Sequence, residues 1–301
     1  MNTTTKTLQF IHVNPLKLAV YEWGKSSPEQ ETIVLLHGYP DSAEVWDRLA
    51  DKLSEQFHVV SYDVRGTGLS DIPARQKHFH SDYLIEDLKQ VIAATSPNKA
   101  VHLVSYDWGS LQAWEGILDD RLKDQVASYT AMTPSLDAIG WWFRREVQKN
   151  SFEGYSNVVK RMTSSSYMVF FQLPVIPELS WRAGLYKVWP KFVAQLQKTT
   201  VPVSKTMLKD ALHSIALYRE NMIKPLFLPS SRKTTIPTHM LILTKDPFVP
   251  RAISESMREW VENIEYTEID ANHWVMLSHA EQLAQILSDY IGRHNQSKNA
   301  A

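Results

Sequence analysis

The stretch Val104-Ser105-Tyr106-Asp107-Trp108-Gly109-Ser110 decides the expected fold. It follows an apolar run at 101–104 and leads into a helical pattern of apolar residues. We therefore expect a strand, a sharp turn and a helix. Such a turn is strained and needs small residues two positions before and two positions after its apex. Ser105 and Gly109 meet this requirement, which leaves Asp107 at the apex as the candidate nucleophile.

A carboxylate at the apex indicates a particular chemistry. Asp107 is already anionic at neutral pH and needs no base to activate it. It suits attack on a saturated carbon, as in opening an epoxide or displacing a halide, and either reaction leaves an ester on the enzyme. A base-activated water must then hydrolyse that ester. The alternative is an ordinary turn with a surface aspartate, because short motifs also occur by chance.

The composition limits the class of protein. The 301 residues, 44% of them hydrophobic, can form one large domain or a core with an insertion. A formal net charge of −1, with 22% charged residues, provides no field for nucleic acid or an anionic membrane surface. We expect a small molecule as the partner. The sequence leaves the oligomeric state open between monomer and homodimer.

The absence of cysteine excludes disulfides, thiol catalysis and thiolate metal sites. It fits a reducing cytoplasm. The first seven residues are polar, and no apolar run approaches the ~18 residues of a membrane span. We expect a cytoplasmic protein with short frayed ends, no integral membrane segment and no metal. His78 and His80 read as surface histidines because no third ligand accompanies them.

Strand and helix patterns alternate along much of the chain, which predicts a mostly parallel sheet with helices on both faces. The turn Asn14-Pro15 indicates an antiparallel hairpin at the start. A helix is expected at 252–261 and a last helix at 281–291, followed by a polar tail at 295–301. The expected strands are 8–13, 16–23, 32–36, 59–62, 101–104, 126–132, 236–243 and 264–269.

The alternation stops after the strand at 126–132. From about residue 135 to 233 only helical patterns occur, and they are rich in aromatic residues. We expect a helical cap at 135–232, inserted into a core made of 1–134 and 233–301.

Hydrolysis of an ester needs a base matched to neutral pH, which favours histidine. His273 lies just past the last expected strand, where parallel sheets place their chemistry. A catalytic imidazole also needs an acceptor that sets its tautomer. Asp246 follows another strand and gives the order nucleophile, acid, histidine. Asp137 stays open as a second candidate for the acid.

The tetrahedral intermediate on the nucleophile's carboxylate needs two backbone N–H donors. We expect them from Tyr39, in the loop after the strand at 32–36, and from Trp108, directly after the nucleophile. A cis bond before Pro40 would bend this loop.

At these residues the sequence resembles the epoxide hydrolases of the α/β-hydrolase superfamily, from about residue 16 to 292. The family's His-Gly-x-Pro pattern is matched by His37–Pro40 and its Asp-Trp-Gly by Asp107–Gly109. Ser105 departs from the glycine of many members, but it is also small. The resemblance implies the α/β-hydrolase fold, with a mostly parallel eight-stranded sheet and an inserted helical cap.

Two tyrosines of the cap carry the more specific resemblance. Family members hydrogen-bond the epoxide oxygen with two tyrosine hydroxyls, one of them in a Tyr-x-x-x-Phe-Gln-x-Pro segment. Tyr167 begins a matching segment at 167–174, and Tyr218 resembles the second site. Either tyrosine alone would more often be cap packing. The pocket residues that the resemblance implies are His37, Pro40, Phe171 and Trp274.

The resemblance implies an epoxide as substrate and neither cofactor nor metal. The aromatic cap, with the apolar run 168–171 and residues 175–176, favours a small, apolar epoxide. The bacterial branch most similar to this chain is sometimes fused to a short-chain dehydrogenase. No nucleotide-binding half occurs in these 301 residues, so no NAD is implied, and whether the native chain continues stays open.

Other readings remain open. Haloalkane dehalogenases share the Asp nucleophile and the following Trp, but they usually place a halide donor such as Asn where Tyr39 stands. Fluoroacetate dehalogenases carry an arginine after the nucleophile, which Ser110-Leu111-Gln112 lacks. A serine esterase is disfavoured because no Gly-x-Ser-x-Gly occurs. A ligand-binding protein without turnover is the last alternative.

Overall fold

A computed structural model describes residues 5–27 and 29–299, with no side-chain description for 297–299. Its centre is one eight-stranded sheet in the order β1-β2-β4-β3-β5-β6-β7-β8. The pairs β1/β2 and β2/β4 are antiparallel, and all the others are parallel. This confirms the predicted mostly parallel sheet. The strands are β1 Lys6–Val13, β2 Leu16–Trp23, β3 Thr32–Leu36, β4 His58–Tyr62, β5 Val101–Ser105, β6 Val126–Ala131, β7 Thr238–Leu243 and β8 Ile264–Ile269.

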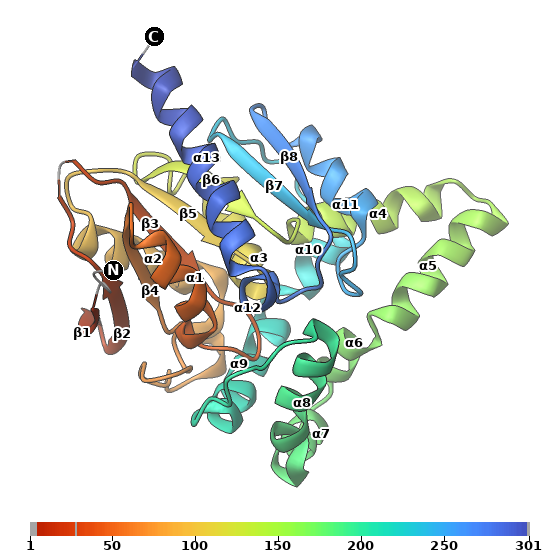
Figure 1. Ribbon diagram of the computed structural model, residues 1–301. Coiled ribbons are helices and arrows are strands. Elements are labelled where there is room, and N and C mark those ends of the chain that lie inside the picture. Colours follow the sequence, from red (N-terminus) through yellow and green to blue (C-terminus); the bar gives the residue numbers. More distant parts are fainter. Residues whose placement is uncertain (1–4, 28, 300–301) are drawn as a thin grey trace.

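Helices cover both faces of the sheet (Figure 1). Alternate residues of the buried strand β3 point to opposite faces, so that Val34 and Leu36 join one apolar cluster and Ile33 and Leu35 the other. The first cluster includes α2 (Ser81–Thr95), α3 (Asp107–Ile117) and α11 (Arg251–Ser256) with the 3-10 turn Met257–Glu259. The second includes α1 (Asp47–Leu53) with the 3-10 turn Ala43–Trp46, α12 (Val275–Ser278) and α13 (Ala280–Asn299). A further 3-10 turn at Gln76–Phe79 precedes α2.

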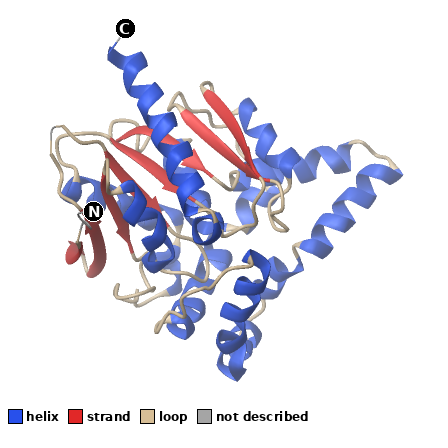
Figure 2. Ribbon diagram, viewed as in Figure 1, coloured by secondary structure: helices blue, strands red, loops and turns tan. Residues whose placement is uncertain are grey.

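A run of helices separates β6 from β7, and Figure 2 shows no strand within it. Helices α5, α7 and α8 project away from the sheet, whereas α9 lies against the core (Figure 1). The segment comprises α4 (Leu136–Gln148), α5 (Phe152–Ser164), α6 (Ser166–Gln172), α7 (Ile176–Ser180), a π turn (Trp181–Leu185), α8 (Tyr186–Gln197), α9 (Met207–Asn221) and α10 (Ile223–Phe227).

Two boundaries differ from the predictions. Helix α13 continues to Asn299, so the expected polar tail is wrong for 295–299, whereas 300–301 lie outside the described residues. The apolar periodicity stops at Ile291, but Arg293 and Gln296 are good helix formers, and the single glycine at 292 does not end the helix. The helix expected at 252–261 is a short α-helix followed by a 3-10 turn.

The peptide bond before Pro40 is cis, as predicted, and so is the one before Pro15. Residues 1–4, part of the segment expected to fray, lie outside the described residues. Within the described part of the chain, no helix combines the length and the apolar character that crossing a membrane requires.

Candidate active site

Asp107 stands where β5 meets α3, at the sharp turn that the sequence predicted. Its φ of 48° lies in the left-handed region, and its backbone N–H donates to Oγ1 of Thr133 at 2.9 Å. The turn is packed closely, because a Cβ at Gly109 would lie 2.2 Å from the carbonyl oxygen of Leu36. A Cβ at Gly38 would lie 2.4 Å from that of Asp107. The close approach of the backbone at Gly38 and Gly109 fixes the turn that carries Asp107 at the end of β5.

The loop after β3 supplies a donor to this carboxylate. The backbone N–H of Tyr39 donates to Oδ1 of Asp107 at 2.7 Å. The N–H of Trp108, the second donor expected from the sequence, lies in the first turn of α3 and makes no hydrogen bond to the Asp107 carboxylate among the described residues. One of the two expected donors is therefore engaged in this state.

His273 and Asp246 complete the cluster. Nδ1 of His273 lies 2.7 Å from Oδ2 of Asp246, and Nε2 lies 3.6 Å from Oδ2 of Asp107. The Asp246 side chain is 1% exposed, and its Oδ1 accepts from the N–H groups of Phe248 at 2.7 Å and Val249 at 3.2 Å. The buried acceptor thus orients the ring so that Nε2 faces the nucleophile candidate.

Asp137, the other candidate for the acid, is engaged elsewhere. Its carboxylate accepts from Ser230 and from Nη2 of Arg232, which lies at 2.8 Å. The structure gives it no contact with His273, because it lies in the first turn of α4 rather than in a loop beside α12. Only Asp246 can act on the histidine in this arrangement.

The charge of His273 follows from this geometry. Burial by itself lowers the pKa of the imidazole, but the carboxylates of Asp246 and Asp107 outweigh it and raise the pKa to about 10. His273 is therefore an imidazolium at neutral pH while both carboxylates are ionised. Removal of the negative charge on Asp107 would lower this pKa.

Tyr167 on α6 and Tyr218 on α9 lie beside Asp107 and His273. Tyr218 on α9 is 3% exposed, and its ring lies 6.5 Å from that of Tyr167 on α6, centroid to centroid. Burial, and then the charge of Asp107, raise the pKa of each phenol, so both keep their protons. In the resting enzyme both phenols can therefore donate hydrogen bonds, and neither is ionised at neutral pH.

Asp107, His273 and both tyrosines line one small cavity with a volume of about 20 Å³. That is room for about one water molecule. Most of the remaining wall is apolar. The other lining residues are Trp108, Leu111, Thr133, Pro134, Ile139, Arg161, Met168, Phe248, Val249, Pro250 and Ile253.

The four residues expected in the pocket lie around this cavity rather than in its wall. Phe171 packs on the ring of Tyr218, with centroids 4.7 Å apart. His37 is buried, which lowers its pKa, and its Nε2 accepts from Val64 N–H at 3.0 Å. Its Nδ1–H must then donate to the carbonyl of Gly38 at 2.9 Å, so His37 fastens the loop that carries Tyr39 and Pro40.

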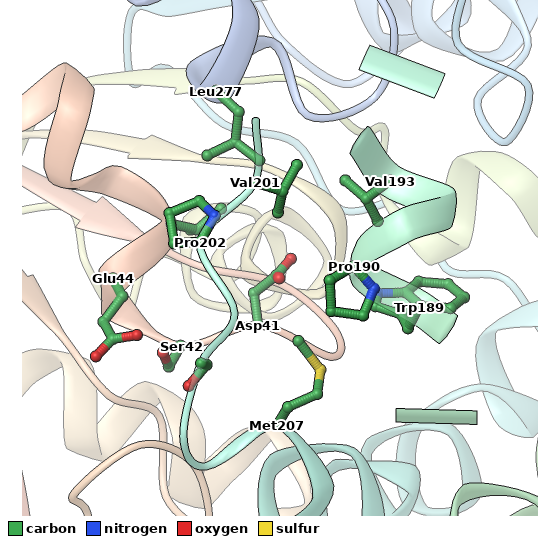
Figure 3. A pocket seen from close by; sticks show the side chains of 12 residues that line it. Asp41, Ser42, Glu44, Trp189, Pro190, Val193, Val201, Pro202, Met207 and Leu277 are labelled. Carbon is green, nitrogen blue, oxygen red and sulfur yellow. The ribbon is translucent and has the colours of Figure 1, made fainter. Parts of the chain in front are cut away.

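Trp274, the last of the four, leads to a residue that the sequence analysis missed. Nε1 of Trp274 donates to Oδ2 of Asp41 at 2.8 Å, and the hydroxyl of Tyr106 donates to the same oxygen. Asp41 thus connects Tyr106, the residue before Asp107, and Trp274, the residue after His273, to the loop that carries Tyr39. It also borders a separate cavity of about 30 Å³, and Figure 3 shows its side chain below that of Val201 and to the left of Pro190.

Thr133 and Arg161 were missed as well. Thr133 follows β6 beside a proline, a position that could have been examined as the end of a parallel strand. Arg161 lies within α5, where no motif singles it out. No group of three His, Asp or Glu side chains suited to a metal ion occurs in 5–27 and 29–299.

Comparison with known families agrees with this arrangement. A family described as the alpha/beta hydrolase fold matches residues 31–280, which is most of the chain. The chain belongs to the α/β-hydrolase family. The eight-stranded sheet and the turn at Asp107 are therefore features of an α/β-hydrolase.

Individual relatives of this α/β-hydrolase carry two kinds of name. A Mycobacterium tuberculosis protein named "Probable oxidoreductase EphD" is 30% identical over 288 residues, which are 91% of this chain and 48% of that protein. The chain thus spans about half the length of that relative. "Epoxide hydrolase 3" of Xenopus tropicalis is 25% identical over 274 residues, which are 86% of this chain and 71% of that protein.

The solved structure of a Bacillus megaterium epoxide hydrolase in complex with an inhibitor is similar in fold. The TM-score is 0.75 at 23% identity, over 94% of this chain and 100% of that one. At this identity the likeness concerns the fold of the α/β-hydrolase.

Proposed function

We propose that this α/β-hydrolase is an epoxide hydrolase, which converts an epoxide and water to a vicinal diol. One observation carries the proposal: a carboxylate, a carboxylate-bound histidine and two protonated tyrosines line a single cavity. The relative named epoxide hydrolase supports it. Residues 135–232 would act as a cap that brings Tyr167 and Tyr218 over Asp107.

The first step forms an ester. A carboxylate oxygen of Asp107 attacks a ring carbon, the carbon–oxygen bond of the ring breaks, and its electron pair goes to the oxygen. Tyr167 or Tyr218 gives that oxygen its proton and becomes a tyrosinate. Alkoxides are poor leaving groups, so donors aimed at the developing charge lower the barrier.

The second step hydrolyses the ester, and the structure supports a way to switch it on. Once Asp107 is esterified its negative charge is gone, and the pKa of His273 falls because only Asp246 still raises it. His273 can then release its proton, and the tyrosinate takes a proton back, so that these two transfers balance. The neutral imidazole takes a proton from water as the water attacks the carbonyl carbon of Asp107.

The tetrahedral intermediate places negative charge on the former carboxylate oxygen. The N–H of Tyr39, already 2.7 Å from Oδ1, is one donor to it, and we assign the N–H of Trp108 as the second. The ester bond to the substrate then breaks, and the diol oxygen takes the proton from His273. The carboxylic acid left on Asp107 gives its remaining proton to the neutral imidazole, which restores the carboxylate of Asp107 and the imidazolium of His273. One water is consumed, and no cofactor takes part in these steps.

The test is a single-turnover reaction in ¹⁸O-labelled water, with styrene oxide and a matched bromoalkane as substrates. We expect diol from the epoxide, label in the Asp107 peptide and no bromide. His273→Gln should accumulate an adduct on Asp107 in intact-mass spectra, whereas His12→Gln, at an exposed position on β1, should behave as wild type. Bromide without diol would replace the proposal by a dehalogenase, and neither product with either substrate would favour a binding protein.

A further inference from the structure

Arg161 is a buried cation in the wall of the cavity described above, and the proposed mechanism does not use it. It is 9% exposed and lies on α5, with Tyr167, Phe248 and His273 in the same wall. A charge removed from water is costly unless it is paired and hydrogen-bonded. The guanidinium therefore needs an explanation.

Its pairing within the chain is incomplete. Nη2 of Arg161 donates to the carbonyl oxygen of Phe248 at 2.5 Å. Nε is buried and has no hydrogen-bond partner among the described residues, and no carboxylate of that part of the chain lies within 4.0 Å of the guanidinium. Burial lowers the pKa of Arg161, but the group stays charged at neutral pH.

The helix itself is oriented in an unusual way. The buried residues of α5 are Gly154 and Arg161, seven positions apart on one face. Its large apolar residues face solvent, among them Phe152 at 91% exposed and Val159 at 62%. Because packing of apolar side chains does not account for this orientation, the inward position of Arg161 points to a role at the cavity.

We propose that Arg161 binds an anionic group of the substrate, a carboxylate close to the epoxide ring, and so sets the specificity of the enzyme. The proposal rests on the proposed epoxide hydrolysis. A guanidinium presents paired N–H donors that match the two oxygens of a carboxylate. It would also offset the repulsion between an anionic substrate and the carboxylate of Asp107.

The remaining wall defines the rest of the substrate. Leu111, Ile139, Met168 and Ile253 offer an apolar surface on which a hydrocarbon or aromatic part can pack. The substrate class is thus an epoxide of an apolar carboxylic acid. This substrate class would replace the small, apolar epoxide expected from the sequence.

The experiment compares trans-3-phenylglycidate with trans-β-methylstyrene oxide, which differ by a carboxylate in place of a methyl group. We expect the wild type to have the higher kcat/KM for the glycidate. Arg161→Met should lower that kcat/KM by about 10- to 150-fold, as loss of a charge-assisted hydrogen bond does, and leave the neutral epoxide within a few-fold. The kcat/KM of Arg161→Lys for the glycidate should fall between those of the wild type and Arg161→Met. Arg144→Met, at an exposed position on α4, should match the wild type with both epoxides.

Two results would overturn the proposal. One is a wild type with no preference for the glycidate. The other is an equal loss for both epoxides in Arg161→Met, which would mean that Arg161 only holds the loop of Phe248. Thermal melts of each variant show whether it is folded.

A binding measurement distinguishes failure of the anion site from failure of the proposed epoxide hydrolysis. Binding of 3-phenylpropionate, which has no epoxide, is therefore measured by calorimetry with wild type and Arg161→Met. If neither epoxide is hydrolysed but the acid binds in an Arg161-dependent way, the anion site stands and epoxide hydrolysis falls. Absence of binding to the wild type would remove the anion site.

Discussion

The substitution Asp107→Asn should lower the pH at which His273 titrates. Nε2 of His273 lies 3.6 Å from Oδ2 of Asp107, whose side chain is 19% exposed. Coulomb's law at this distance gives about 1.2 kcal/mol in water and about 4.6 kcal/mol at an effective dielectric constant of ~20. At 1.36 kcal/mol per pH unit, the midpoint should fall by about 1 to 3 pH units. The asparagine side chain imitates the loss of charge that ester formation causes.

The assay is an NMR titration of protein labelled at histidine Cε1. Of the 11 histidines, the signal of His273 is the one lost in His273→Gln. Asp246→Asn should lower the midpoint further, because that carboxylate is 2.7 Å from Nδ1 and 1% exposed. Asp270→Asn is the control, since this carboxylate is 74% exposed and pairs with Lys245. An unchanged or higher midpoint in Asp107→Asn would refute the proposed activation of the base.

Three further predictions concern packing, positioning and pH. Gly109→Ala should lower the free energy of unfolding in urea titrations by at least about 1–3 kcal/mol, because the added Cβ would meet the Leu36 carbonyl oxygen. The control is Gly292→Ala: its Cβ would meet no atom within 4 Å, so this variant should stabilise α13 slightly. Asp41→Ala leaves two buried donors unpaired and should lower both kcat and Tm; Asp51→Ala, which frees a donor of Trp23, should lower only Tm. The raised pKa of His273 adds stability to the folded state. This contribution is complete below the unfolded pKa of about 6.5 and is lost as the pH rises to about 10. In denaturant titrations, His273→Gln should therefore flatten the fall of the free energy of unfolding with pH over this range.

Features that depend on local sequence were predictable. The apolar runs determine the strands, and Gly109, two positions after Asp107, reflects a backbone contact that excludes a Cβ. The helical stretch after β6 lacks strand patterns, and the structure has helices there. The end of α13 was not predictable from apolar periodicity, because polar residues form an exposed helix or a tail equally well.

Features that depend on the meeting of distant loops were not predictable. Asp41 follows a cis proline and resembles an ordinary helix-start aspartate in sequence. Its carboxylate gains a role only because Tyr106 and Trp274, 65 and 233 positions away, donate to it. Thr133 is a second example. Its hydroxyl oxygen accepts from the backbone N–H of Asp107, and the direction of that N–H follows from the turn rather than from the residue type.

Arg161 shows why the substrate is harder to predict than the reaction. The groups that make and break bonds must meet one geometry, so their residue types recur at fixed places along the chain. Substrate recognition needs only complementary charge and shape, which any helix bordering the cavity can supply. On α5 that charge comes from one arginine, and its importance depends on burial in the same cavity wall as Tyr167 rather than on a motif. The charge inside the cavity is therefore the feature on which the identification of the substrate depends.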